Sequence, residues 1–156
     1  MRFLGIDLGD RRTGLALADT FTRIASPLTV LEIPRSQDGG RTLLHAVARE
    51  AANQLGPNDA VVIGLPLNMD ESEGPAAKSV RDWGASLAPL LSGRAMHFQD
   101  ERLSSVEADW DMARSGLTHA GKKQRRDALA AAAILRSFLQ TIPGAAHGPE
   151  TFDAES

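Results

Sequence analysis

The stretch "MRFLGIDLGDRRTGLALAD" (residues 1–19) places two apolar runs on either side of the polar letters "GDRR". The first run predicts a buried strand and the second a strand after a short loop, so the two are expected to form a hairpin. A further run, "SPLTVLEI" (residues 26–33), extends the hairpin into an antiparallel meander of three strands. One carboxylate, Asp7, stands inside the first apolar run, and a buried charge is costly unless something pairs with it.

After residue 40 the pattern alternates between helical and strand-like spacing. Helices are expected over 41–57, 74–91, 104–116 and 122–140, and strands over 59–66 and 94–101. The expected buried stripes are Leu44, Val47, Ala48, Ala51 and Leu55 on the first helix, and Ala76, Val80, Trp83 and Leu87 on the second. This order predicts an α/β fold, with a mixed five-stranded sheet covered by helices.

Length and composition indicate one domain. The chain has 156 residues, 42% of them hydrophobic, and no cysteine, which excludes disulfides and thiolate metal sites. Residues 1–142 are expected to form the domain and residues 143–156 a disordered acidic tail. No apolar run approaches 18 residues and no signal segment is visible, so a cytoplasmic protein without membrane contact is expected.

Three carboxylates occupy unusual positions in this pattern. Asp7 lies in the first strand, Glu101 ends the last strand, and Asp127 shares the buried face of the final helix. Three inward carboxylates from three elements would repel one another unless they were protonated or bound a cation. Carboxylate oxygens suit Mg²⁺ or Mn²⁺, and two such ions about 4 Å apart can support phosphodiester hydrolysis.

Each carboxylate also has a structural interpretation. Asp7 could mark a bulge or an ion pair, Glu101 could cap a helix or pair with Arg102, and Asp127 could pair with Lys123, Arg125 or Arg126. Asp100 competes with Glu101 for a place in the site. Because adjacent strand residues face opposite sides, only one of them can join it, and the other is expected to pair with Arg102 or to cap the next helix.

Four motifs in this order resemble the YqgF (RuvX) family: "GIDLGDRRTGLALAD", "VVIGLPLNMDESEG", "DERLSSVEA" and "KKQRRDALAAAAIL". These are small bacterial RNase H-like proteins described as pre-16S ribosomal RNA nucleases and Holliday junction resolvase homologues. The resemblance spans residues 1–142. It implies an RNase H-like fold and a metal-dependent nuclease site made of Asp7, Glu101 and Asp127. In two places the chain departs from the family pattern, with Glu71 where Gly is usual and "LSS" where Leu-Thr-Thr is usual.

The resemblance favours maturation of the 5′ end of pre-16S ribosomal RNA, with ribosomal particles as expected partners. Cleavage of four-way DNA junctions uses the same chemistry and is the alternative. Candidate substrate-binding residues are Arg11, Arg12, Asn68, Lys122, Lys123, Arg125 and Arg126. Each of them could equally be an ordinary loop residue or part of a solvated helix face. Gly9 and Gly64 are expected to allow close approach of a substrate backbone.

Two other function classes fit parts of the sequence. The motif Asp-x-Gly also opens the phosphate loop of actin-like sugar kinases, but that fold needs two such domains and this chain has room for one. A non-catalytic nucleic-acid-binding module is the other class, and the three intact carboxylates argue against it. Both a monomer and a homodimer are compatible with the sequence.

Overall fold

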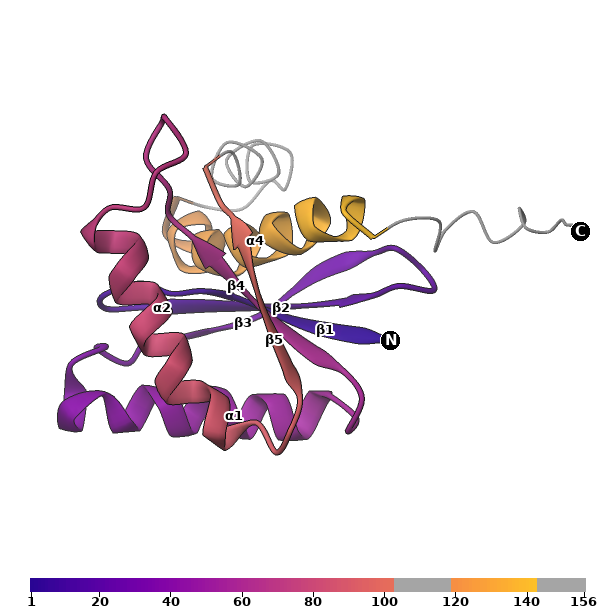
Figure 1. The fold of residues 1–156 in the computed structure, drawn as a ribbon, viewed down its shortest axis with the longest axis horizontal. Helices are drawn as coiled ribbons and strands as arrows, with labels where there is room; N and C mark the ends of the chain where they lie inside the picture. Colours follow the sequence, from indigo (N-terminus) through magenta and orange to yellow (C-terminus); the bar gives the residue numbers. More distant parts are fainter. Residues whose placement is uncertain (103–118, 143–156) are drawn as a thin grey trace, which may run out of the picture.

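The sheet and its helices appear in a computed structural model that describes residues 1–102 and 119–142, with side chains in the second range from residue 125 onward (Figure 1). The elements are β1 (Arg2–Asp7), β2 (Thr13–Asp19), β3 (Ala25–Leu31), a 3₁₀ turn (Gln37–Gly40), α1 (Arg41–Gln54), β4 (Ala60–Leu65), α2 (Pro75–Leu87), a second 3₁₀ turn (Ala88–Leu90), β5 (Ala95–Asp100) and α4 (His119–Gln140). The helix expected over 104–116 and the tail 143–156 lie outside the described residues.

The five strands form one sheet in the order β3-β2-β1-β4-β5. β1 pairs antiparallel with β2, and β2 with β3, while β1 and β4, and β4 and β5, pair in parallel. The expected meander and mixed five-stranded sheet are therefore confirmed. β1 is central, so a side chain at its carboxyl end has a strand on each side.

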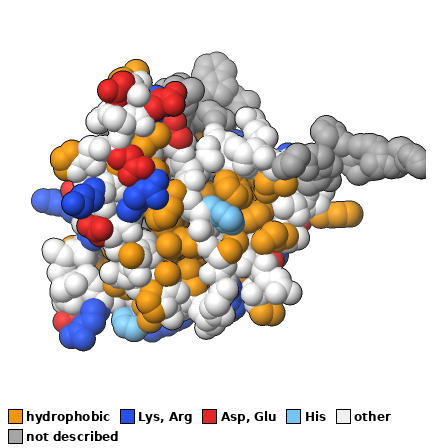
Figure 2. Space-filling view, viewed as in Figure 1, with side chains coloured by type: hydrophobic (Ala, Val, Ile, Leu, Met, Phe, Trp, Pro, Cys, Tyr) orange, Lys and Arg blue, Asp and Glu red, His pale blue; other side chains and the backbone are white. Residues whose placement is uncertain are grey.

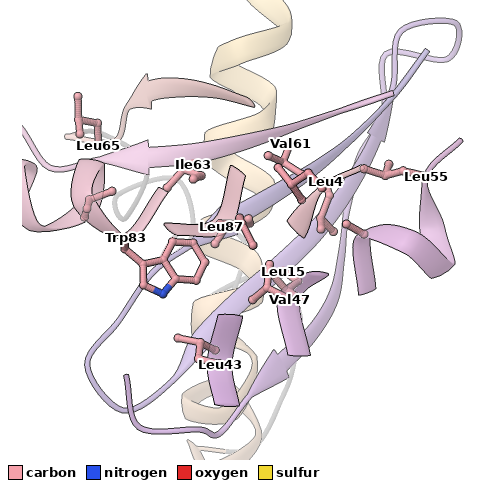
Figure 3. Close-up of a cluster of buried hydrophobic side chains, with 14 of the residues drawn as sticks. Leu4, Leu15, Leu43, Val47, Leu55, Val61, Ile63, Leu65, Trp83 and Leu87 are labelled. Carbon is pink, nitrogen blue, oxygen red and sulfur yellow. The ribbon is translucent and has the colours of Figure 1, made fainter. Parts of the chain in front are cut away.

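Alternation along the strands divides the core into two layers. Leu4 and Ile6 of β1 join the cluster that packs under α1 and α2 (Figure 3). Phe3 joins the second cluster, which is built on α4, and Gly5 also lies against α4. Since successive strand residues alternate between faces, Asp7 belongs to the α4 face. Figure 1 shows α4 on the opposite side of the sheet from α1.

Small residues let α4 approach the sheet closely. A Cβ on Gly5 would collide with the Leu135 side chain, and one on Gly14 would overlap the Asp127 backbone. Every residue of α4 from 128 to 135 is buried, and four of these are consecutive alanines. This close contact fixes the height of Asp127 above β2.

The helices of the other layer bury slightly different faces from those expected. In α1 Leu43 is buried together with the expected Val47 and Ala51, while Leu44 and Ala48 are only partly buried. In α2 Ala77 is buried and Ala76 is exposed, so the predicted stripe was wrong by one position at its start. Trp83 is buried as expected, and α2 ends at Leu87 before Pro89. Within the described ranges, no helix has the length and apolar character needed to cross a bilayer.

We expect Asp59→Ala to lower the free energy of unfolding by about 1–3 kcal/mol, because two backbone N–H groups would lose their charged acceptor. The Asp59 carboxylate accepts hydrogen bonds from the amides of Arg2 (2.9 Å) and Gly56 (2.7 Å) at the end of the sheet away from Asp7. Urea unfolding would measure the loss. Asp82→Ala, on the exposed face of α2, is the matched control and should change stability little; equal effects of the two substitutions would contradict this role.

Candidate active site

Asp7 lies at the carboxyl end of β1, paired in register with Gly14 of β2. Its side chain is neither fully buried nor freely exposed. Burial raises the pKa of Asp7 to about 7, and the negative charges of Glu101 and Asp127 contribute to the rise. The other two carboxylates that were singled out in the sequence therefore act electrostatically on Asp7.

Glu101 follows directly after β5 and is held at the edge of β4. Its backbone N–H donates to the Leu65 carbonyl at 3.2 Å, which continues the pairing of the two strands. A Cβ on Gly64 would overlap the Glu101 carboxylate and the Ile134 side chain. Gly64 thus makes room for Glu101, and not for a substrate backbone as the sequence suggested. Burial raises the pKa of Glu101, and the charge of Asp100 adds to the rise.

Asp127 projects from α4 and forms an ion pair with Arg12, whose Nε lies 3.3 Å from Oδ2. Burial raises the pKa of Asp127, while Arg12 and, more weakly, Arg126 oppose the rise. The sequence offered Lys123, Arg125 or Arg126 as ion-pair partners. Arg12 was overlooked because it is far away in the chain and becomes a neighbour only when α4 packs over β2.

Asp100 is engaged by Arg102. The Arg102 guanidinium donates three hydrogen bonds to the Asp100 carboxylate, at 2.6, 2.9 and 3.1 Å, and these lower the pKa of Asp100. The same guanidinium donates to the Met69 carbonyl at 3.2 Å and lies 3.7 Å from Glu71. The sequence expectation that one member of the Asp100–Glu101 pair would bind Arg102 is confirmed. Arg102 thereby ties the loop after β4 to the end of β5.

The loop after β4, residues 66–74, is acidic and closed on itself. The Asn68 backbone N–H donates to the Ser72 carbonyl (2.9 Å), and its side-chain amide donates to the Ser72 hydroxyl (3.0 Å). Asn68, expected to bind substrate, is thus used within the loop. Glu71 adopts a positive φ of 70°, a conformation that glycine takes at lower cost. This fits the Gly that the YqgF pattern usually has there. Figure 2 shows acidic side chains gathered over this part of the surface.

The remaining candidate cations belong to the β1–β2 turn and to α4. Arg11 is exposed in the turn between β1 and β2, and Arg125 and Arg126 are exposed on α4. The side chains of Lys122 and Lys123 lie outside the described residues. Gly9 allows this turn to close, because a Cβ there would overlap the Arg12 carbonyl. The structure therefore gives Gly9 a role in the turn, different from the substrate contact expected of it.

The donor set of the site consists of carboxylate oxygens, the ligands that hard divalent cations prefer. In the part of the chain that is described, no three His, Cys, Asp or Glu side chains converge tightly enough to hold one ion. Asp127 is turned towards Arg12, 3.3 Å away. The chemistry of Asp7, Glu101 and Asp127 therefore fits a divalent metal, but shared coordination requires their side chains to move closer.

Known proteins agree with this architecture. Thermus thermophilus RuvC, in a structure with a Holliday junction substrate, superposes with a TM-score of 0.56 over 88% of this chain and 92% of RuvC, at 16% sequence identity. A second structure of the same protein gives a TM-score of 0.50 at 15% identity, covering 89% of this chain and 94% of that one. At this level of identity the likeness concerns the fold, which is the expected RNase H-like arrangement.

Comparison of sequences identifies the family, whereas the likeness to RuvC concerns the fold. A protein of Chelativorans sp. (strain BNC1) named "Putative pre-16S rRNA nuclease" is 38% identical over 138 residues, which cover 88% of this chain and 82% of that protein. A protein of the same name from Anaeromyxobacter sp. (strain Fw109-5) is 41% identical over 139 residues, 89% of this chain and 96% of that protein. The family model described as "RuvX: Holliday junction resolvase" matches residues 1–141. The chain therefore belongs to the RuvX family of nucleases.

Proposed function

We propose that this protein is a divalent-metal-dependent endonuclease that cleaves phosphodiester bonds of structured RNA, in maturation of the 5′ end of pre-16S ribosomal RNA. The observation that carries the proposal is that Asp7, Glu101 and Asp127 come from three separate elements, and that burial together with the charges of Glu101 and Asp127 raises the pKa of Asp7. The names of the curated relatives support the choice of RNA. Such an enzyme would work in the cytoplasm, on precursor ribosomal particles.

Asp7, Glu101 and Asp127 would hold Mg²⁺ or Mn²⁺, as one ion or two. When bound, divalent ions supply an activated water and stabilise the leaving oxygen of the phosphodiester. The protein supplies the positioning. Gly64 leaves space for the Glu101 side chain, and Arg12 pairs with Asp127 through its Nε.

In this proposal Asp100 is not one of the metal ligands. Its carboxylate accepts hydrogen bonds from the Arg102 guanidinium, whose positive charge offsets part of the negative charge of Asp100. The site therefore presents Glu101 as the carboxylate at the end of β5, with Asp100 held away by its cation. A phosphate group approaching Asp7 would meet less negative charge than the sequence "DE" suggests.

Cleavage of four-way DNA junctions is the second candidate. It is favoured by the description of the RuvX family and by the likeness to RuvC, whose structure was solved with a Holliday junction. The two substrates need the same carboxylates, so the difference lies in how the rest of the surface receives the nucleic acid.

The proposal is tested by incubating the full-length protein with a pre-16S RNA fragment spanning the 5′ processing region, and with a synthetic four-way DNA junction. Each reaction contains Mg²⁺, Mn²⁺ or EDTA. We expect cleavage of the RNA with either metal and none in EDTA. Cleavage that persists in EDTA would refute the metal site, and cleavage of the junction alone would make the second candidate correct. Binding of RNA without any cleavage would indicate a non-catalytic module.

A further inference from the structure

Two hollows adjoin on the side of the site away from loop 66–74. One, of about 570 Å³, lies beside the β1–β2 turn and is lined by Arg11, Arg12 and Glu32 among others. The second, of about 230 Å³, runs between β3 and α4 and is lined by Thr29, Arg125 and again Glu32. Glu32 lines both hollows, and we call the two together the β3 groove. It begins at Arg12, the residue that contacts Asp127.

Charge favours this groove as the path of a polyanion. Arg11 lines one hollow and Arg125 the other, and among the described residues neither has an ion-pair or hydrogen-bond partner. On the opposite side of the site, loop 66–74 presents Asp70 and the 76%-exposed Glu71. A phosphate chain is attracted to unpaired arginines and repelled by carboxylates, so it should leave the site along the β3 groove.

Two carboxylates, Asp10 and Glu32, also line this groove. Asp10 forms an ion pair with Arg35 at 2.9 Å. Glu32 lines both hollows, and within the described part of the chain it has no cation beside it at ion-pair distance. A carboxylate in that place cannot accept a phosphate, but it can accept a hydrogen bond from a hydroxyl of the sugar between two phosphates. The 2′-hydroxyl is the group by which a protein distinguishes RNA from DNA at one position.

We propose that the β3 groove binds a ribonucleotide strand on one side of the cleaved bond, with Arg11 and Arg125 on its phosphates and Glu32 accepting a hydrogen bond from a 2′-hydroxyl. The inference rests on the proposed nuclease function, because the strand is the one that continues from Asp7. It adds a path for the substrate and a residue that selects RNA.

The first test measures binding in an Asp7→Asn background, so that no cleavage intervenes. The probe is a labelled RNA hairpin with a single-stranded extension, and the titrations are repeated at several salt concentrations. We expect Arg11→Gln and Arg125→Gln each to weaken binding roughly 3- to 10-fold and to lower the salt slope by about 1. Arg49→Gln on α1 removes the same charge from the opposite face and is the control. Equal effects of all three substitutions would overturn the proposed path.

The second test compares the same hairpin in RNA and in DNA. We expect Glu32→Ala to reduce the ratio of RNA to DNA affinity several-fold, the size of one lost hydrogen bond to a charged group. Glu32→Gln keeps an oxygen acceptor and should retain part of the preference, whereas Glu50→Ala on α1 should leave the ratio unchanged. An unchanged ratio in Glu32→Ala would overturn the role of Glu32.

The outcomes also separate this inference from the nuclease proposal. A wild-type protein that cleaves RNA with Mg²⁺, while the groove variants bind like the control, would leave the nuclease in place and remove the groove. A wild-type protein that does not cleave, while the groove variants lose binding, would keep the groove as an RNA-binding surface and refute the nuclease.

Discussion

Asp7→Asn is expected to reduce metal-dependent cleavage by more than about 100-fold, because loss even of residues that only support metal ligands typically costs 10- to 100-fold. An amide keeps the shape of the side chain but removes the charge that a divalent ion needs. Single-turnover cleavage of the RNA fragment at saturating Mg²⁺ would measure the change. Activity within a few-fold of wild type would show that Asp7 is not a ligand.

The same substitution should stabilise the fold at high pH. The pKa of Asp7 is raised from 3.8 to about 7, so the folded state binds this proton more tightly than the unfolded chain does. Wild-type stability should therefore fall as pH rises through this interval, by up to about 4 kcal/mol, since one pKa unit corresponds to 1.36 kcal/mol. Asn is uncharged at every pH, so the variant does not have to bury a charged carboxylate at this position.

Urea unfolding without divalent ions at pH 4, 6 and 8 tests this pH dependence. The difference in unfolding free energy between Asp7→Asn and wild type should be close to zero at pH 4. It should be largest at pH 8, where the variant is the more stable protein. Asp82→Asn on the surface of α2 should show no such trend. A variant that is less stable than wild type at pH 8 would mean that the Asp7 charge is compensated in the folded protein.

Gly14→Ala is expected to cost about 3 kcal/mol of unfolding free energy or more, at the upper end of what overpacking does. The added Cβ would overlap the backbone of Asp127, which cannot rotate away as a side chain could. The helix would have to lift from β2, taking Asp127 out of the site. Loss of cleavage and loss of stability should therefore occur together in this variant.

Gly56→Ala provides the matched control. Its Cβ would meet only the Asp59 carboxylate at 3.4 Å, an ordinary contact, and its φ is not positive. Thermal unfolding and cleavage should both stay close to wild type in this control. If Gly14→Ala behaved in the same way, the close packing of α4 on β2 would not be what places Asp127.

The strands could be predicted from the sequence because their signals are local. The apolar runs before and after "GDRR" define a hairpin, and the short run ending at Leu65 defines a buried strand. The exact buried face of the helices could not be predicted. Leu43 and Leu44 are both apolar, as are Ala76 and Ala77, so the pattern leaves open which member of each pair begins the buried stripe, and packing on the sheet selects Leu43 and Ala77.

The sequence predicted which residues form the site, but it did not predict the contacts between them. Asp7, Glu101 and Asp127 stand out because carboxylates interrupt apolar patterns. The Arg12–Asp127 ion pair and the space that Gly64 gives to Glu101 join residues from distant parts of the chain. Such contacts depend on how closely α4 packs against the sheet, and no local pattern encodes that distance.

The docking of α4 also has a consequence for the order of events during synthesis. This helix is the last of the described elements, and the Arg23 guanidinium of the β2–β3 turn donates to the Leu139 carbonyl (2.7 Å) at its far end. A domain generally folds as a unit, and the second core cluster is built on α4, so the sheet and this helix are expected to become stable together. Asp127 joins Asp7 and Glu101 only when α4 has been synthesised and has docked on the sheet. A nascent chain that ends before α4 therefore has no assembled carboxylate site.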